Sequence, residues 1–89
     1  MKKPISEHIS ERLSIGKEIL MDIPKLSIAG NRELLIENYH FITEYTSEII
    51  RIKTKEYTLK IEGIELNLRC ISREELEISG IFTQISFEH

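Results

Sequence analysis

The sequence feature that most constrains the fold is a change in the spacing of apolar residues at Pro24. Before it, the apolar residues between positions 5 and 20 fall roughly on one face of a helix. After it, apolar and polar residues alternate, which is the period of half-buried strands. Pro24 also keeps Ile23 extended, so a helix is not expected to run through this point. The sequence therefore predicts a short N-terminal helix followed by a mainly β fold.

The alternating stretches recur about every eight or nine residues, with centres near positions 27, 35, 42, 51, 59, 67, 77 and 85. This spacing predicts about eight short strands in a small sandwich, a roll or a solenoid-like sheet, and the sequence does not choose among the three. With 89 residues the chain is one domain. We expect the helix and a connector over residues 1–25 and the β domain over residues 26–89.

A weak repeat, Leu-x-Ile-x-Gly or Leu-x-Ile-x-Asn, organises these strands and ends at Gly30, Asn38, Gly63 and Gly80. In the last three copies an apolar residue follows at once, so the apolar alternation slips by one position. A Gly or Asn with positive φ absorbs such a slip as a bulge or a tight corner. We therefore predict structural turns at all four positions, with positive φ at Gly63 and Gly80.

Five apolar residues occupy positions whose neighbours on the same face are polar, and five in one small domain is unusual. One interpretation is a second buried layer under the N-terminal helix. The other is a contact surface for another chain, to which an unpaired strand edge could add a neighbour's strand. The candidate interface residues are Leu35, Ile42, Ile49, Ile71 and Phe82.

Composition excludes several classes of function. The net charge is −3 and, apart from the pair Lys2-Lys3, the basic residues are scattered singly among glutamates, so a nucleic-acid-binding surface is not expected. No apolar run approaches the roughly 20 residues that span a bilayer. The single cysteine, Cys70, cannot form an internal disulfide. These observations predict a cytoplasmic protein without a membrane span.

No pattern of catalytic or metal-binding residues is present. His8, His40 and His89 lack the spacing of a metal site, and none lies beside the cysteine. Cys70 shares the alternation of apolar neighbours, so we expect a buried small hydrophobic residue rather than a nucleophile. The adjacent acids Glu74 and Glu75 are expected in a solvated turn. We predict no enzyme activity, no metal and no cofactor.

Short elements follow one another in a distinctive order between residues 20 and 88. They are Asp22-Ile23-Pro24-Lys25-Leu26, Ile28-x-Gly30, Ile36-Glu37-Asn38-Tyr39-His40, Thr43-Glu44-Tyr45-Thr46, Ile61-Glu62-Gly63, Ile71-Ser72-Arg73-Glu74-Glu75, Gly80 and Ile85-Ser86-Phe87-Glu88. In their order these segments resemble those of the YabP/YqfC family of bacterial sporulation proteins, most closely the YqfC branch. One departure is Phe41-Ile42, where the family often has a glycine.

The resemblance implies a role in endospore formation, in the mother-cell compartment, with other sporulation proteins as partners. A membrane sporulation protein of the YqfD type is one partner that it implies, and the chain itself is another, as a homo-oligomer. The leading hypothesis is thus a non-enzymatic protein-interaction or assembly module. The alternative is a β domain that binds a small ligand or a glycan, in which aromatic residues would cluster in a pocket. Here the six aromatics are spread over several predicted strands.

Overall fold

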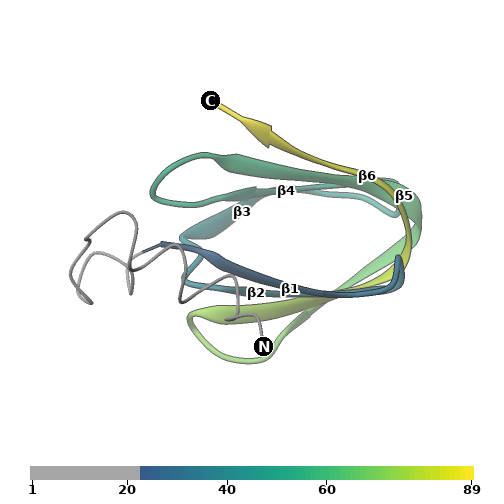
Figure 1. Ribbon diagram of the computed structural model, residues 1–89, viewed down its shortest axis with the longest axis horizontal. Coiled ribbons are helices and arrows are strands. Elements are labelled where there is room, and N and C mark those ends of the chain that lie inside the picture. The colour runs from purple at the N-terminus through teal and green to yellow at the C-terminus, as the bar shows by residue number, and fades with distance from the viewer. Residues whose placement is uncertain (1–22) are drawn as a thin grey trace, which may run out of the picture.

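The computed structural model describes residues 23–89, which form one six-stranded antiparallel sheet (Figure 1). The prediction of a mainly β fold is confirmed, whereas the predicted helix over residues 5–20 lies outside the described residues. Along the sheet the strand order is β1-β2-β6-β5-β4-β3. The strands are β1 (Lys25–Ala29), β2 (Glu33–Glu37), β3 (Phe41–Tyr45), β4 (Ile49–Lys53), β5 (Thr58–Cys70) and β6 (Glu75–Glu88).

The described residues form six strands, where the sequence predicted about eight. The four predicted segments nearest the C-terminus join in pairs, because β5 and β6 are 13 and 14 residues long. Each of the two long strands contains one of the predicted slips of alternation. A slip in the pattern therefore marks a bend within a continuous strand here, not a break between two strands.

The sheet folds over on itself across β5 and β6, as the side view in Figure 1 shows. β2 pairs only with residues 75–79 of β6, and β4 pairs with residues 58–62 of β5. One layer therefore contains β1, β2 and the adjoining halves of the long strands, and the other contains β3, β4 and the remaining halves. The core lies between the layers, where Leu34 and Ile36 of β2 and Ile50 and Ile52 of β4 are fully buried.

Gly63 lies at the fold of β5, but for a different reason from the predicted one. The expectation of positive φ at Gly63 is wrong, since positive φ in this bend occurs at Glu65 (φ 53°). What requires glycine is space. A Cβ at Gly63 would lie 2.2 Å from the carbonyl oxygen of Ile81. This oxygen belongs to the backbone of β6, which cannot move away without disturbing its pairing with β5.

The other three predicted turns have the backbone that the repeat suggested. Gly80 has φ 138°, and a Cβ there would lie 2.8 Å from the Glu65 carbonyl oxygen. Gly30 and Asn38 have φ 58° and 64°. Gly30 lies between β1 and β2, and Asn38 directly follows β2. These positions use the left-handed region that Gly and Asn enter at least cost.

The slip of alternation in β6 lies at Thr83, not at Gly80. The register of β5 and β6 shifts between the pairs Glu62–Gln84 and Gly63–Phe82, so Thr83 is the extra residue of a bulge. The alternation of Leu76 and Ile78 therefore continues unbroken to Phe82, which is buried at 8% exposure. The prediction that Phe82 belongs to an exposed contact surface is wrong, because this residue fills the core at the fold.

Thr46 closes the β3–β4 hairpin and Thr54 closes the β4–β5 hairpin with the same pattern of hydrogen bonds. Thr54 is fully buried, and its Oγ1 donates to the Tyr57 carbonyl (2.7 Å) and accepts from the Tyr57 N–H (3.1 Å). Thr46 is exposed, and its Oγ1 bonds to the Ile49 carbonyl (3.2 Å) and N–H (2.8 Å). Water can replace the bonds of Thr46 more easily than those of Thr54.

We expect Thr54→Val to lower the free energy of unfolding by about 1–2 kcal/mol, because it replaces the hydroxyl by a methyl group of similar shape and so removes these bonds. Thr46→Val is the matched control and should cost less than about 0.5 kcal/mol, since Thr46 is exposed and water can replace its bonds. Urea denaturation followed by circular dichroism measures both. Equal losses in the two variants would show that burial at Thr54 does not matter.

Candidate interaction surface

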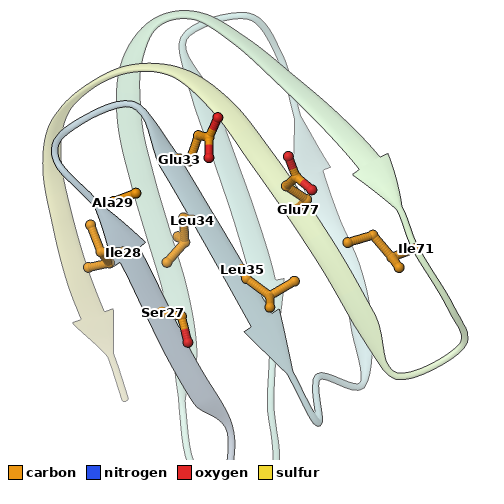
Figure 2. Close-up of a pocket in the computed structure, with 8 residues that line it drawn as sticks. All are labelled: Ser27, Ile28, Ala29, Glu33, Leu34, Leu35, Ile71 and Glu77. Carbon is orange, nitrogen blue, oxygen red and sulfur yellow. The ribbon is translucent and has the colours of Figure 1, made fainter.

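The structure brings two of the predicted interface residues together on the outer face of the β1–β2 layer. Figure 2 shows Leu35 on β2 and Ile71 just after β5, on either side of the β6 strand that carries Glu77. They line a shallow depression of about 350 Å³, hereafter the outer depression. Leu35 is half-buried and Ile71 is 49% exposed. Its full lining is Ser27, Ile28, Ala29, Glu33, Leu34, Leu35, Ile71 and Glu77.

Carboxylates surround the apolar residues of this outer face. Glu33 and Glu77 line the outer depression itself, while Glu37 and Glu75 are direct partners across β2 and β6. Like charges that face each other across two strands oppose the pairing slightly. Lys25 forms a solvent-exposed ion pair with Glu37, with 3.9 Å between Nζ and Oε2, and this pair offsets little of the negative charge. The outer depression is therefore an apolar surface with an acidic rim.

The remaining predicted interface residues lie elsewhere. Ile42 is on edge strand β3, opposite the core residue Ile52, and remains partly exposed. Ile49 is half-buried on the outer face of the other layer, opposite Glu62. The five predicted residues therefore do not form one patch, because Phe82 is buried and the hairpin of β3 and β4 is separate from the outer depression.

The free edges of the sheet expose apolar side chains that the alternation assigned to the inside. Strands β1 and β3 are edges throughout. β4 and β2 pair only with residues 58–62 of β5 and 75–79 of β6, and the turns next to them bond as far as Leu66 and Phe82. Residues 67–70 of β5 and 83–88 of β6 therefore also lack a neighbour on one side. Alternation along a strand cannot reveal that a core-facing residue lies on a free edge, since the pattern is the same whether or not a neighbouring strand covers it. The large exposed apolar side chains missed for this reason are Ile28, Tyr45 and Phe87. Phe41 is exposed because it lies opposite Lys53 on the outer face, and Ile64 because it lies at the irregular bend of β5.

The free edges lie on two sides of the folded sheet, and one side is more polar than the other. On the side of β3 and β5, the Tyr45 hydroxyl accepts from the Leu68 N–H (3.1 Å) and donates to Asn67 Oδ1 (3.4 Å). On the side of β1 and β6, Ile28 and Phe87 are 54% and 53% exposed. A second depression of about 270 Å³ lies there, lined by Ile28, Gly30, Asn31, Phe82, Thr83, Gln84 and Ile85.

Cys70 is exposed, so the prediction of a buried small hydrophobic residue is wrong. The last residues of β5 lie on a free edge, where core-facing positions reach solvent. Its Sγ lies 3.4 Å from the Tyr39 hydroxyl and 3.2 Å from the Ser72 carbonyl oxygen. The hydrogen bond with Cys70, with a smaller effect of burial, raises the pKa of Tyr39 above its ordinary value. Neither contact supplies a base that would make a thiolate.

Arg51 joins three strands across the outer face of the other layer. Its guanidinium bonds to Glu44 of β3 and to Glu88 of β6, the latter at 3.0 Å from Nε. Both bonds favour the charged form and raise the pKa of Arg51 further above its ordinary value. A permanently charged guanidinium between two carboxylates links the strands and does not serve as a general acid or base near neutral pH.

His40 is exposed just before β3, and Glu74 is exposed in the turn before β6. Within residues 23–89, no three His, Cys, Asp or Glu side chains come close enough to hold a metal ion. Over the same residues, no helix is long and apolar enough to cross a membrane.

These features define a small antiparallel β domain, folded across two bent strands, with apolar side chains at its free edges. The model of the YabP family matches residues 22–89, and the chain belongs to this family. The chain is also 21% identical over 86 residues to the Uncharacterized protein YqfC of Bacillus subtilis (strain 168). That alignment covers 97% of this chain and 92% of YqfC. No solved structure matches. The family resemblance inferred from the residues is thus confirmed.

Proposed function

We propose that this chain is a non-enzymatic protein-interaction module that assembles with other proteins during endospore formation, in the cytoplasm of the mother cell. The sporulation setting comes from the family resemblance. The interaction role is supported by one observation above all: large apolar side chains lie exposed at the edges and in the outer depression of a very small domain. Exposed apolar surface of this kind usually marks a contact with another protein.

The outer depression is the surface we assign to a partner. It combines apolar contacts from Leu35 and Ile71 with the acidic rim of Glu33 and Glu77. A partner segment with apolar residues flanked by lysine or arginine complements both features. Ile42 and Ile49, on the hairpin of β3 and β4, remain candidate contacts for a second surface. A membrane sporulation protein of the YqfD type is the partner that the family resemblance implies.

The alternative, a small-ligand or glycan-binding domain, has less support. Such sites are concave and usually lined by aromatic side chains with a few convergent polar groups. The outer depression has no aromatic residue in its lining, and its two carboxylates are the exposed Glu33 and the half-buried Glu77. We therefore keep the interaction module as the proposed function.

We expect Ile71→Glu to abolish capture of the partner while the domain stays folded, because Ile71 is half-exposed and a further carboxylate beside the acidic rim removes an apolar contact. The intact wild-type chain and the variant are used as baits in extracts of sporulating cells, including solubilised membranes, and bound proteins are identified by mass spectrometry. Circular dichroism checks folding of each bait.

Thr43→Glu is the matched control, since it makes the same charge change at an exposed position on β3, away from the outer depression. It should capture the same partner as wild type. If wild type enriches nothing over Ile71→Glu, or if both variants lose the partner equally, the outer depression is not the contact surface.

A further inference from the structure

The C-terminal half of β6 is a free edge that carries no charged residue before its last position, Glu88. Residues 78–87 form the longest uncharged stretch of the chain, bounded by Glu77 and Glu88. Within it, residues 83–87 lie in the half of β6 that β2 does not cover. Proteins normally protect a free edge with charge, proline or a covering side chain.

The other three free edges of the described sheet each carry such protection. β1 begins with Lys25, directly after Pro24. β3 has a bulge between Ile42 and Glu44, which distorts the edge. Residues 67–70 of β5 contain Arg69 and are covered by the Tyr45 hydroxyl. The edge of β6 is thus the one suited to strand addition.

The hydrogen-bond pattern shows which backbone groups of this edge are available. The bond from the Gly63 N–H to the Glu48 carbonyl (3.0 Å) continues the β4–β5 ladder, so odd-numbered residues in the first half of β5 bond to β4. Its even-numbered residues therefore face β6, where their partners are even-numbered too. Ile85 and Phe87 consequently point their N–H and C=O groups away from β5, to a side where no described strand pairs with them.

We propose that a second copy of this chain pairs antiparallel with this edge, with Ser86 on the two-fold axis. This inference rests on the proposed assembly role and names one partner. Ile85 of each copy then lies opposite Phe87 of the other, and the two pairs exchange backbone hydrogen bonds. A β-branched residue opposite an aromatic one is a favourable cross-strand pair. The layer containing β3, β4, β5 and β6 continues from one copy into the next.

Charge favours a second copy as the occupant. Every residue from Thr83 to Phe87 is neutral, so the strand meets itself without like charges in opposition. Glu88 lies opposite Gln84 of the second copy, so the two Glu88 residues are roughly 13 Å apart, beyond a Debye length of about 8 Å. The segment before β1, residues 1–22, contains no five consecutive uncharged residues that could pair in the same way.

The test uses Ser86→Glu, with Ser86→Gln as a control of the same shape. Within one copy the introduced carboxylate lies opposite Lys60 of β5, which favours folding, whereas the two introduced carboxylates oppose each other across the two-fold axis. Sedimentation equilibrium of the full chain gives the dissociation constant of the dimer. We expect Ser86→Glu to raise it at least about tenfold above Ser86→Gln, and high salt to narrow the difference.

A backbone variant tests the same edge independently. Phe87→Pro removes an N–H that points away from β5, so it should weaken the dimer at least about tenfold more than Phe87→Ala while the monomer stays folded. Amide exchange adds a third readout: the Ile85 and Phe87 amides should be protected only at concentrations where dimers form.

A strictly monomeric wild type would overturn the inference, as would dimers that tolerate both Ser86→Glu and Phe87→Pro. Protection of the two amides at every concentration would assign the edge to the chain's own residues 1–22 and also overturn it. Each of these results leaves partner capture through the outer depression unaffected, so failure of the inference is distinguishable from failure of the proposed function.

Discussion

Gly63→Ala is expected to lower the free energy of unfolding by more than about 3 kcal/mol, which would leave much of a domain this small unfolded. The added Cβ would lie 2.2 Å from the Ile81 carbonyl oxygen and 2.9 Å from Leu66 Cδ2. The side chain of Leu66 can move, but the carbonyl belongs to the backbone of β6 at the fold of the sheet. Relief of the clash would therefore separate β5 from β6 where they cross between the layers.

Gly30→Ala is the control for the intrinsic cost of replacing a glycine. Gly30 has φ 58°, but a Cβ there meets nothing within 4 Å, so only the conformational penalty of about 1 kcal/mol applies. Chemical denaturation of both variants separates the two effects. Equal losses of unfolding free energy in the two variants would mean that the close approach of β5 and β6 at Gly63 adds no cost beyond that of replacing a glycine.

Phe82→Glu is expected to prevent folding, with a loss above about 4 kcal/mol. It would place a carboxylate at the fold of the sheet, within the core and without a cationic partner. Ile64→Glu is the informative comparison, since Ile64 is on the same bend but 54% exposed. We expect Ile64→Glu to cost less than about 1 kcal/mol.

These two variants test where the alternation slips. If the slip in β6 were at Gly80, as the repeat alone suggests, Ile81 would face the core and Phe82 would face water. Circular dichroism and thermal melting of Phe82→Glu and Ile64→Glu distinguish the arrangements. A folded Phe82→Glu together with an unfolded Ile64→Glu would require a different register between β5 and β6 from the one described here.

The sequence alone was sufficient for the fold class and the family. Alternation of apolar residues is a local property of each strand, so it identified the strand segments without knowledge of their neighbours. Gly63 and Gly80 of the repeat lie at the bends of β5 and β6, although the slip of alternation in β6 is at Thr83 and not at Gly80. Apolar residues at polar positions also identified Leu35 and Ile71, which the structure places in one depression.

Tertiary structure decided the strand order, the free edges and the position of the bulge, because no local sequence pattern determines which strands pair. β2 pairs with β6, although β3, β4 and β5 lie between them along the chain, and it pairs only with residues 75–79 of β6. That partial coverage creates the free edges on which Cys70 and Phe87 are exposed, although their alternation resembles that of core residues. The position of a bulge likewise depends on the opposite strand, which is why Phe82 is buried and Ile64 is not. Alternation tells which side chains share a face, and only the pairing of distant strands tells whether that face is covered.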